Sequence, residues 1–266
     1  MNASRIYSIF LRQIFLVKSN PIRLLSLFTW LIIDIFQWGF LTKYLGSFGG
    51  AVFNIVTVLL GSIILWEFMG RIQQGIMTAF LEDVWTQNFV NFFASPLEVK
   101  EYLLGLILTS IITSAIGFGI MLLIAGFIFG YNIFVIGLYI LPFILLLFIF
   151  GVAMGIFITA LIFKIGPSAE WLGWPIPAVM AIFVGVFYPV SALPHYLQFI
   201  SQVLPPTYVF EGVRSVLAGN YNIVANLVIG FILAFIYLFI SYLVFLKVYH
   251  NNLKSGSISR FSAESV

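Results

Sequence analysis

The sequence predicts an all-helical protein that crosses a membrane several times. Of its 266 residues, 62% are hydrophobic and only 8% are charged, whereas soluble domains carry roughly 25% charged residues. A soluble chain of this length could not hide so much apolar surface, so lipid must be the solvent for much of it. The chain between residues 102 and 163 contains no Asp, Glu, Lys or Arg, as expected for segments inside a bilayer.

Six apolar runs are candidates for membrane spans. The expected spans are residues 24–41, 51–70, 102–125, 133–163, 171–188 and 223–248. A hydrocarbon core of about 30 Å needs roughly 20 helical residues. The fourth run is longer than that, and we expect it to tilt, to kink near Pro142 or to protrude. Residues 1–266 are therefore expected to form a single transmembrane domain.

The first 20 residues predict an amphipathic helix that lies in the membrane interface. Arg5 and Arg12 are seven residues apart, and apolar residues fill the opposite side of the helix. This pattern is typical of interfacial helices. No small-residue cleavage site follows, and the next apolar run is long enough to span, so the segment does not resemble a cleavable signal peptide.

Residues 189–220 are apolar but interrupted by prolines. The four prolines are Pro189, Pro194, Pro205 and Pro206. Since proline breaks a helix interior but is tolerated in its first turn, we expect two short helices, residues 195–203 and 207–218. Neither reaches the length needed to cross, which predicts an external re-entrant hairpin buried against protein. Glu211 and Arg214, three residues apart, are expected to form an ion pair within it.

The basic residues predict the orientation in the membrane. With six spans both termini lie on one side, and ten of the 12 Lys and Arg residues then fall on that side. Lys43 and Arg214 are the two on the other side. Such a bias marks the cytoplasmic face. The net charge of +3 is explained by these anchors, and no nucleic-acid partner is expected.

Residues 81–93, on the predicted cytoplasmic side, have an apolar rhythm typical of a short amphipathic helix. Acidic residues at its start would suit the helix dipole. Two interpretations are open, a helix lying on lipid headgroups and a docking helix for a soluble partner. The residues expected at the docking surface are Glu82, Asp83, Val84, Trp85, Phe89 and Phe92.

The order of these parts resembles the transmembrane subunit of ABC exporters of the type-two permease family. The resemblance covers nearly the whole chain. Three short sequence segments also resemble those of the family. They are Glu82-Asp83 through Ala94-Ser95-Pro96-Leu97, Tyr188-Pro189-Val190-Ser191-Ala192-Leu193-Pro194, and Leu204-Pro205-Pro206-Thr207-Tyr208 leading to Gly212-Val213-Arg214. The resemblance implies a plasma-membrane protein of a prokaryote that dimerises with itself or with a similar permease. It also implies two copies of a separate P-loop ATPase, which would bind ATP and magnesium and push on residues 81–93.

The chain itself has no G-x-x-x-x-G-K-[ST] phosphate loop, and we expect it to bind no cofactor. Asp34 lies in the middle of the first span, where a carboxylate costs about 2.5–3.5 kcal/mol on insertion scales. With its neighbours Gln37 and Trp38 it is expected to line a pathway or to make a dimer or helix contact. Glu67 and Arg71, four residues apart, are expected to pair structurally on the second span.

Two other function classes are alternatives. A stand-alone carrier or channel would need an internal repeat or a filter sequence, and we find neither. An intramembrane enzyme would need a cluster of catalytic side chains, and none is evident. The substrate stays open among lipid-linked glycans, drug-like amphiphiles and lipids. Aromatic residues near the span ends suit an interfacial belt, although sugars also stack on such side chains.

Overall fold

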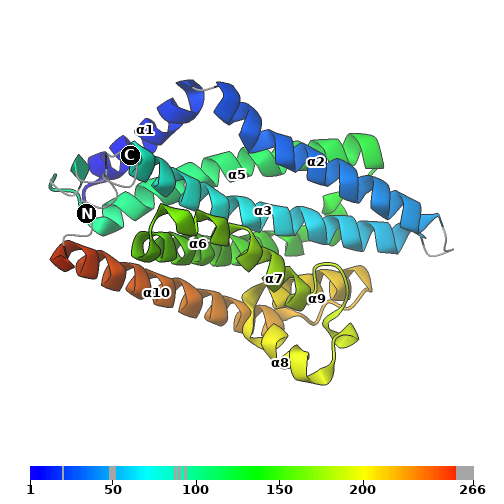
Figure 1. Ribbon diagram of the computed structural model, residues 1–266. Coiled ribbons are helices and arrows are strands. Elements are labelled where there is room, and N and C mark those ends of the chain that lie inside the picture. The colour runs from blue at the N-terminus through cyan, green and yellow to red at the C-terminus, as the bar shows by residue number, and fades with distance from the viewer. Residues whose placement is uncertain (20, 48–51, 87, 89–90, 93–94, 256–266) are drawn as a thin grey trace.

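The computed structural model describes residues 1–19, 21–47, 52–86, 88, 91–92 and 95–255, excluding the side chains of residues 21–28, 52–57 and 167. In this part of the chain every regular element is a helix, as the composition predicts. The long helices run roughly side by side in an elongated bundle, with the first helix crossing one end of it at an angle (Figure 1).

The elements follow the predicted order along the chain. They are α1 (Ala3–Ser19), α2 (Pro21–Gly46), α3 (Val52–Trp85), α5 (Val99–Phe129), η1 (Ile133–Tyr139), α6 (Ile140–Ile165), η2 (Pro167–Gly173), α7 (Pro175–Phe183), η3 (Val190–Ala192), α8 (His195–Val203), α9 (Pro205–Leu217) and α10 (Val224–Ser255).

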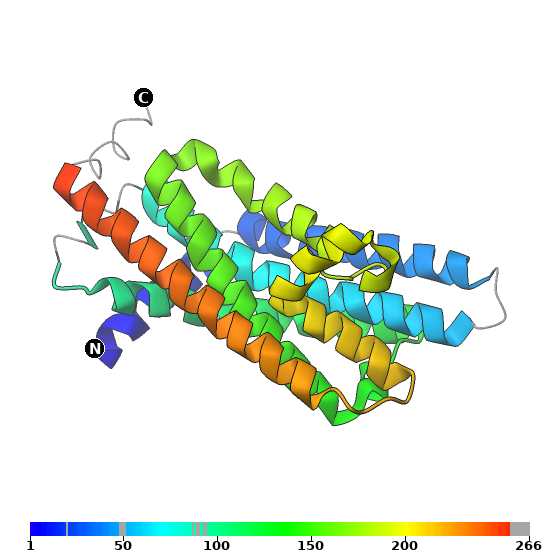
Figure 2. The same ribbon diagram turned by 90° about the horizontal axis from the view of Figure 1, so that it is seen from below.

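Three helical segments of the described chain are long and apolar enough to cross a membrane: Val99–Phe129, Ile133–Ile165 and Val224–Ser255. The start of α1 and the end of α10 lie at the same end of the bundle, which we call the terminal end (Figure 1). Helices α8 and α9 lie toward the opposite end, the hairpin end. Figure 2 shows the chain returning from α6 through η2 and α7 toward this second end.

Helix α3 is the central element, since it packs against α2, α5 and α6. Its approach to α6 depends on two glycines one turn apart, Gly151 and Gly155. A Cβ atom on Gly151 would lie 2.9 Å from the carbonyl oxygen of Met69, and one on Gly155 would lie 3.0 Å from the Cβ of Ile76. Small residues at a spacing of four let membrane helices approach closely, so this pair fixes α6 against α3.

The second predicted span and the start of the predicted cytoplasmic helix are one element in the structure. Helix α3 continues without a break from Val52 to Trp85, over 34 residues, which is about 51 Å at the rise of an α-helix. The expectation of a separate helix that begins at residue 81 is therefore wrong, because residues 81–85 are the last residues of α3. Polar residues after Gly70 make contacts with other elements, as when Gln73 Nε2 donates to the carbonyl of Gly173 at 3.2 Å.

The long fourth run bends at a different residue from the one we expected. Gly137 lies in η1 with φ 67° and ψ −150°, a conformation favoured by glycine, and the regular helix α6 begins three residues later. Pro142 falls in the first turn of α6, where a missing backbone N–H has no cost. Of the three alternatives, a kink near Pro142 is therefore not found, because the chain bends at Gly137 instead.

The fifth predicted span, residues 171–188, is not a single long helix. The 3-10 helix η2 ends at Gly173, and α7 has only nine residues, about 14 Å of α-helix. Helix α7 starts at Pro175, which has no N–H to continue a preceding helix. A glycine with φ 80°, Gly185, follows its end. An α-helix of this length cannot cross a bilayer alone.

The two short helices predicted between residues 189 and 220 are present. Helix α8 has the expected bounds, and α9 begins at Pro205 instead of residue 207 because prolines fit the first turn. Helix α9 packs on α10, α6 and α3, and it buries Val209, Phe210 and Val213 completely.

Candidate functional site: the clamp and the cavity along α3

Helix α1 is tied to the last turns of α3 by a buried ion pair. The guanidinium of Arg12 contacts a carboxylate oxygen of Asp83, whose side chain is fully buried. The Tyr102 hydroxyl, on α5, donates to the other oxygen at 2.7 Å. Gln13 of α1 adds a hydrogen bond to the carbonyl of Ala79 at 3.2 Å. A buried carboxylate is tolerated only when it is paired and hydrogen-bonded, and these contacts meet that requirement.

A second set of contacts ties α1 to the start of α5. Glu101 is 1% exposed, and it accepts the backbone N–H of Asn2 at 2.6 Å and that of Glu98 at 3.1 Å. Arg5 lies 3.4 Å from the same carboxylate and also donates to the backbone carbonyl of Pro96. We call Arg5, Arg12, Asp83, Glu101 and Tyr102 the clamp. It holds together the two ends of the connection between α3 and α5.

The residues of the predicted docking surface lie in different environments. Val84 is 2% exposed and belongs to the core, and Asp83 belongs to the clamp. The rings of Phe92 and Tyr102 pack together with their centroids 5.8 Å apart. The guanidinium of Arg12 lies over the Phe92 ring, 4.9 Å from its centroid. Trp85, at the end of α3, is 54% exposed. Glu82 is half-buried, and Phe89 lies outside the described residues.

A cavity of about 480 Å³ lies beside α3, roughly midway along the bundle. Its walls come from α2, α3, η2 and α7. The lining residues are Trp30, Asp34, Trp66, Glu67, Gly70, Arg71, Gln73, Gln74, Gly173, Trp174, Pro177 and Ala178. Two carboxylates, one guanidinium and two amides thus share the cavity with three indole rings. Charged groups inside membrane helices are costly and commonly mark substrate pathways.

The electrostatics of the cavity centre on Arg71. Asp34 and Glu67 are close enough to repel one another, and both are attracted to the guanidinium of Arg71. Glu67 and Arg71 are one turn apart on α3, as expected, whereas Asp34 reaches the group from α2. Burial of an isolated charge would be unfavourable, so the attraction of both acids to one cation favours their common place in the cavity.

The structure separates the three residues that were predicted to act together on the first span. Asp34 lines the cavity. Trp38 stacks on Phe187, with ring centroids 4.9 Å apart and an interplanar angle of 19°. Gln37 is exposed on the outside of α2. Only Asp34 is therefore a candidate for the cavity chemistry, while Trp38 joins α2 to the segment that follows α7.

In the hairpin, Glu211 and Arg214 pair at 3.2 Å as predicted, but they also hold the segment that precedes η3. Arg214 donates to the carbonyls of Gly185 and Val186, and Glu211 accepts the N–H of Val190 at 2.9 Å. Burial lowers the pKa of the Arg214 guanidinium, and the Glu211 carboxylate partly offsets this. Pro189 and Pro194 bound η3, whereas Pro205 and Pro206 begin α9.

The clamp was not anticipated from the sequence. The signal was present in the seven-residue spacing of Arg5 and Arg12 and in two acids, Asp83 and Glu101, near the two ends of the predicted cytoplasmic connection. Nothing in the sequence shows which acid meets which arginine, because the partners are 71 and 96 residues apart. Within the described ranges, no three His, Asp or Glu residues are grouped so that they could hold a metal ion.

A family model described as ABC-2 type transporter matches residues 5–218 of the chain, a range that includes the clamp, the cavity and the hairpin. No curated protein matches the chain.

Proposed function

The chain belongs to the ABC-2 type transporter family, and we propose that it is the membrane-spanning permease subunit of an ATP-driven exporter. In this proposal two copies form a homodimer around the translocation pathway. Two copies of a separate P-loop ATPase bind ATP and magnesium and supply the energy. The family and the long apolar helices make the chain an integral membrane protein of a transport system. The ATPase partnership, the dimer, the copy numbers, the substrate and the direction of transport are proposed.

The observation that carries the proposal is that one helix joins the candidate docking end to the cavity. Helix α3 bears Trp85 at the terminal end and Glu67 and Arg71 in the cavity wall. Arg71 and Trp85 are 14 residues apart, or about 21 Å along an α-helix. Because the clamp fixes the end of α3 to α1 and α5, a push at this end would move α3 as a unit and change the cavity that it lines.

The cavity supports an amphipathic substrate. Its carboxylates, guanidinium and amides can bind a polar head, and its indole rings can pack against an apolar body or a sugar face. Ligand sites commonly combine an apolar lining with a few convergent polar groups. Lipid-linked glycans and drug-like amphiphiles both have this character.

We propose that both termini lie in the cytoplasm of a prokaryotic cell, with η2 and α7 together making the fifth crossing and α8 and α9 forming an external re-entrant hairpin. The chain has no native cysteine, so single cysteines report cleanly on sidedness. With an impermeant thiol reagent on intact cells, Ser191→Cys and Asn220→Cys are expected to be labelled, and Asn251→Cys only after permeabilisation. Labelling of Ser191→Cys and Asn220→Cys from opposite sides would contradict the hairpin.

The function is tested by purifying the chain together with a candidate P-loop ATPase from the same organism. We expect a complex with equal numbers of the two subunits whose hydrolysis rises with a transported amphiphile. Truncation of an aromatic anchor in an interface typically costs about 2 kcal/mol, or roughly thirtyfold in affinity, so Trp85→Ala should strip the ATPase from the complex. The matched control is Tyr196→Ala, which removes an aromatic side chain of 72% exposure at the hairpin end. Transport without any ATPase would favour a stand-alone carrier.

A further inference from the structure

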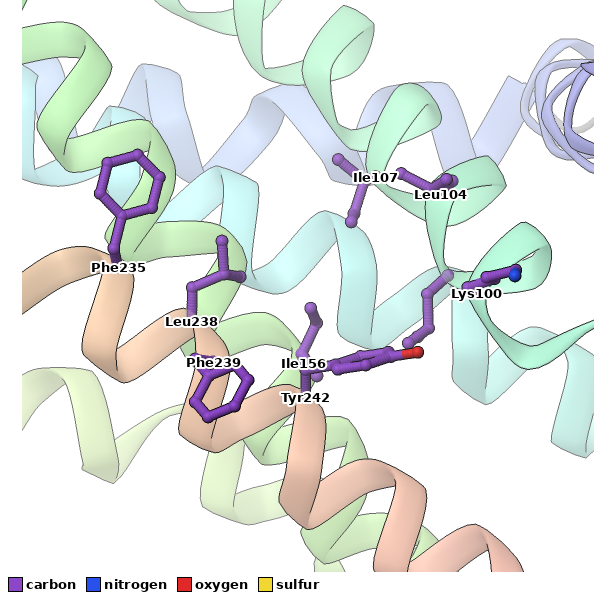
Figure 3. A pocket seen from close by; sticks show the side chains of 9 residues that line it. Lys100, Leu104, Ile107, Ile156, Phe235, Leu238, Phe239 and Tyr242 are labelled. Carbon is purple, nitrogen blue, oxygen red and sulfur yellow. The ribbon is translucent and has the colours of Figure 1, made fainter. Parts of the chain in front are cut away.

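An apolar groove of about 430 Å³ lies on the outside of the bundle, apart from the cavity and the clamp. One wall is α5, with Lys100, Leu104 and Ile107, and the other is α10, with Phe235 and Tyr242 among others. Figure 3 shows the side chains of the two walls facing one another. Helix α5 packs on α1, α2 and α3, whereas α10 packs on α6 and α9, so the groove separates two groups of helices.

The groove is polar at one end only. Its lining is aliphatic or aromatic apart from the ammonium of Lys100 and the hydroxyl of Tyr242, and Figure 3 shows both polar atoms at the same end. Lys100 is in the first turns of α5, at the terminal end of the bundle. Phe235 and Phe239 are 56% and 63% exposed, and they lie on a helix long and apolar enough to span the bilayer. The groove therefore faces lipid.

Within the described chain, the ammonium of Lys100 forms an exposed ion pair. Its ammonium lies 2.7 Å from Glu98, and both side chains are nearly half exposed. Exposed ion pairs of this kind are weak, so another anion can join or replace Glu98. The adjacent acid, Glu101, is occupied by Arg5 and by the N–H groups of Asn2 and Glu98. A phosphate at this position would meet a cation and a hydroxyl donor.

We propose that the groove binds an anionic phospholipid, with an acyl chain between α5 and α10 and the phosphate held by Lys100 and Tyr242. An apolar channel that ends in a lysine matches this ligand in both shape and charge. A zwitterionic lipid carries its own cation beside the phosphate and gains less from Lys100. Glu98 caps the start of α5 and lies two residues after Pro96, which Arg5 of the clamp contacts. A lipid bound at Lys100 would thus lie next to the end of the connection between α3 and α5.

The test compares phosphatidylglycerol with phosphatidylcholine of identical acyl chains, bound to the purified full-length chain and counted by native mass spectrometry. One lysine near a membrane surface contributes about 1 kcal/mol toward anionic lipid, so we expect a preference for phosphatidylglycerol of about fivefold. Lys100→Gln should abolish the preference and Lys100→Arg should retain it. Leu104→Trp, which fills the groove, should reduce binding of both lipids. Phe239→Ala should also reduce binding of both lipids, and the protein should still fold because this side chain is exposed.

The matched control is Lys247→Gln. It removes another exposed lysine, which lies on α10 toward the terminal end of the bundle but does not line the groove. It should leave the preference unchanged. The proposal is overturned if the wild-type chain binds both lipids equally, if Lys100→Gln keeps the preference, or if Lys247→Gln removes it to the same extent. Binding that is unaffected by Leu104→Trp and by Phe239→Ala would also overturn it, because the acyl chain would then lie elsewhere.

Discussion

Arg12→Ala is expected to destabilise the chain by about 3 kcal/mol, because it leaves the fully buried carboxylate of Asp83 without its cation. Removing one partner of a buried pair typically costs about 3–5 kcal/mol. We use the lower end of that range since the Arg12 side chain is 25% exposed. For a chain of this size the loss corresponds to a fall of roughly 6–12 °C in the midpoint of thermal unfolding, measured on the detergent-solubilised protein.

The control for this change is Lys18→Ala, which removes an exposed cation from the same helix and should leave the midpoint unchanged. The partner change Asp83→Asn keeps an acceptor for Tyr102 but removes the charge, so the double variant with Arg12→Ala should be less than additive. If Arg12→Ala unfolds at the wild-type temperature, α1 is not clamped to α3 and is merely resting on the membrane surface.

Asp34→Leu is expected to abolish most transport, by at least about tenfold, while the protein still folds and binds its ATPase. A tenfold loss requires only about 1.4 kcal/mol of lost interaction with the transported head group. Folding should survive because Arg71 retains Glu67, one turn away on α3. The measurement is transport of amphiphiles that stimulate hydrolysis by the wild-type complex, with thermal stability recorded for the same preparation.

Arg71→Leu tests the structural role of the cation in the cavity. It leaves both Asp34 and Glu67 in the cavity without a cation, so this variant should lose stability as well as transport. Thr113→Leu is the matched control, since it removes a polar group from α5 outside the cavity and should transport normally. Wild-type transport by Asp34→Leu would show that Asp34 makes only a helix contact.

The sequence predicted the helical class, the order of the elements and the helix at residues 195–203, because apolar runs and prolines are local signals. It did not predict that α3 continues to Trp85. The acids at positions 82 and 83 suggested a helix start through the dipole rule, but they lie in the last turn of α3. Asp83 is stable there because Arg12 and Tyr102 satisfy it, and those contacts exist only after the chain has folded.

The cavity could not be predicted from the sequence, for the same reason. Asp34 has no basic residue near it on its own helix, and its cation, Arg71, is provided by the packing of α2 against α3. The short helix in the fifth predicted span could have been predicted more easily, since Pro175 and Pro177 are visible in the sequence. Two prolines near the start of an apolar run should have weighed against a continuous helix.

The most direct test of the account is a cysteine cross-link between the end of α3 and the ATPase. With no cysteine in the native chain, Trp85→Cys and Tyr196→Cys each provide one thiol, at opposite ends of the bundle. In the assembled complex, a short thiol-to-amine cross-linker at Trp85→Cys should capture the ATPase, with a yield that changes when ATP is added, and Tyr196→Cys should capture none. Capture from the hairpin end, or none from Trp85→Cys in an active complex, would contradict docking of the ATPase at α3.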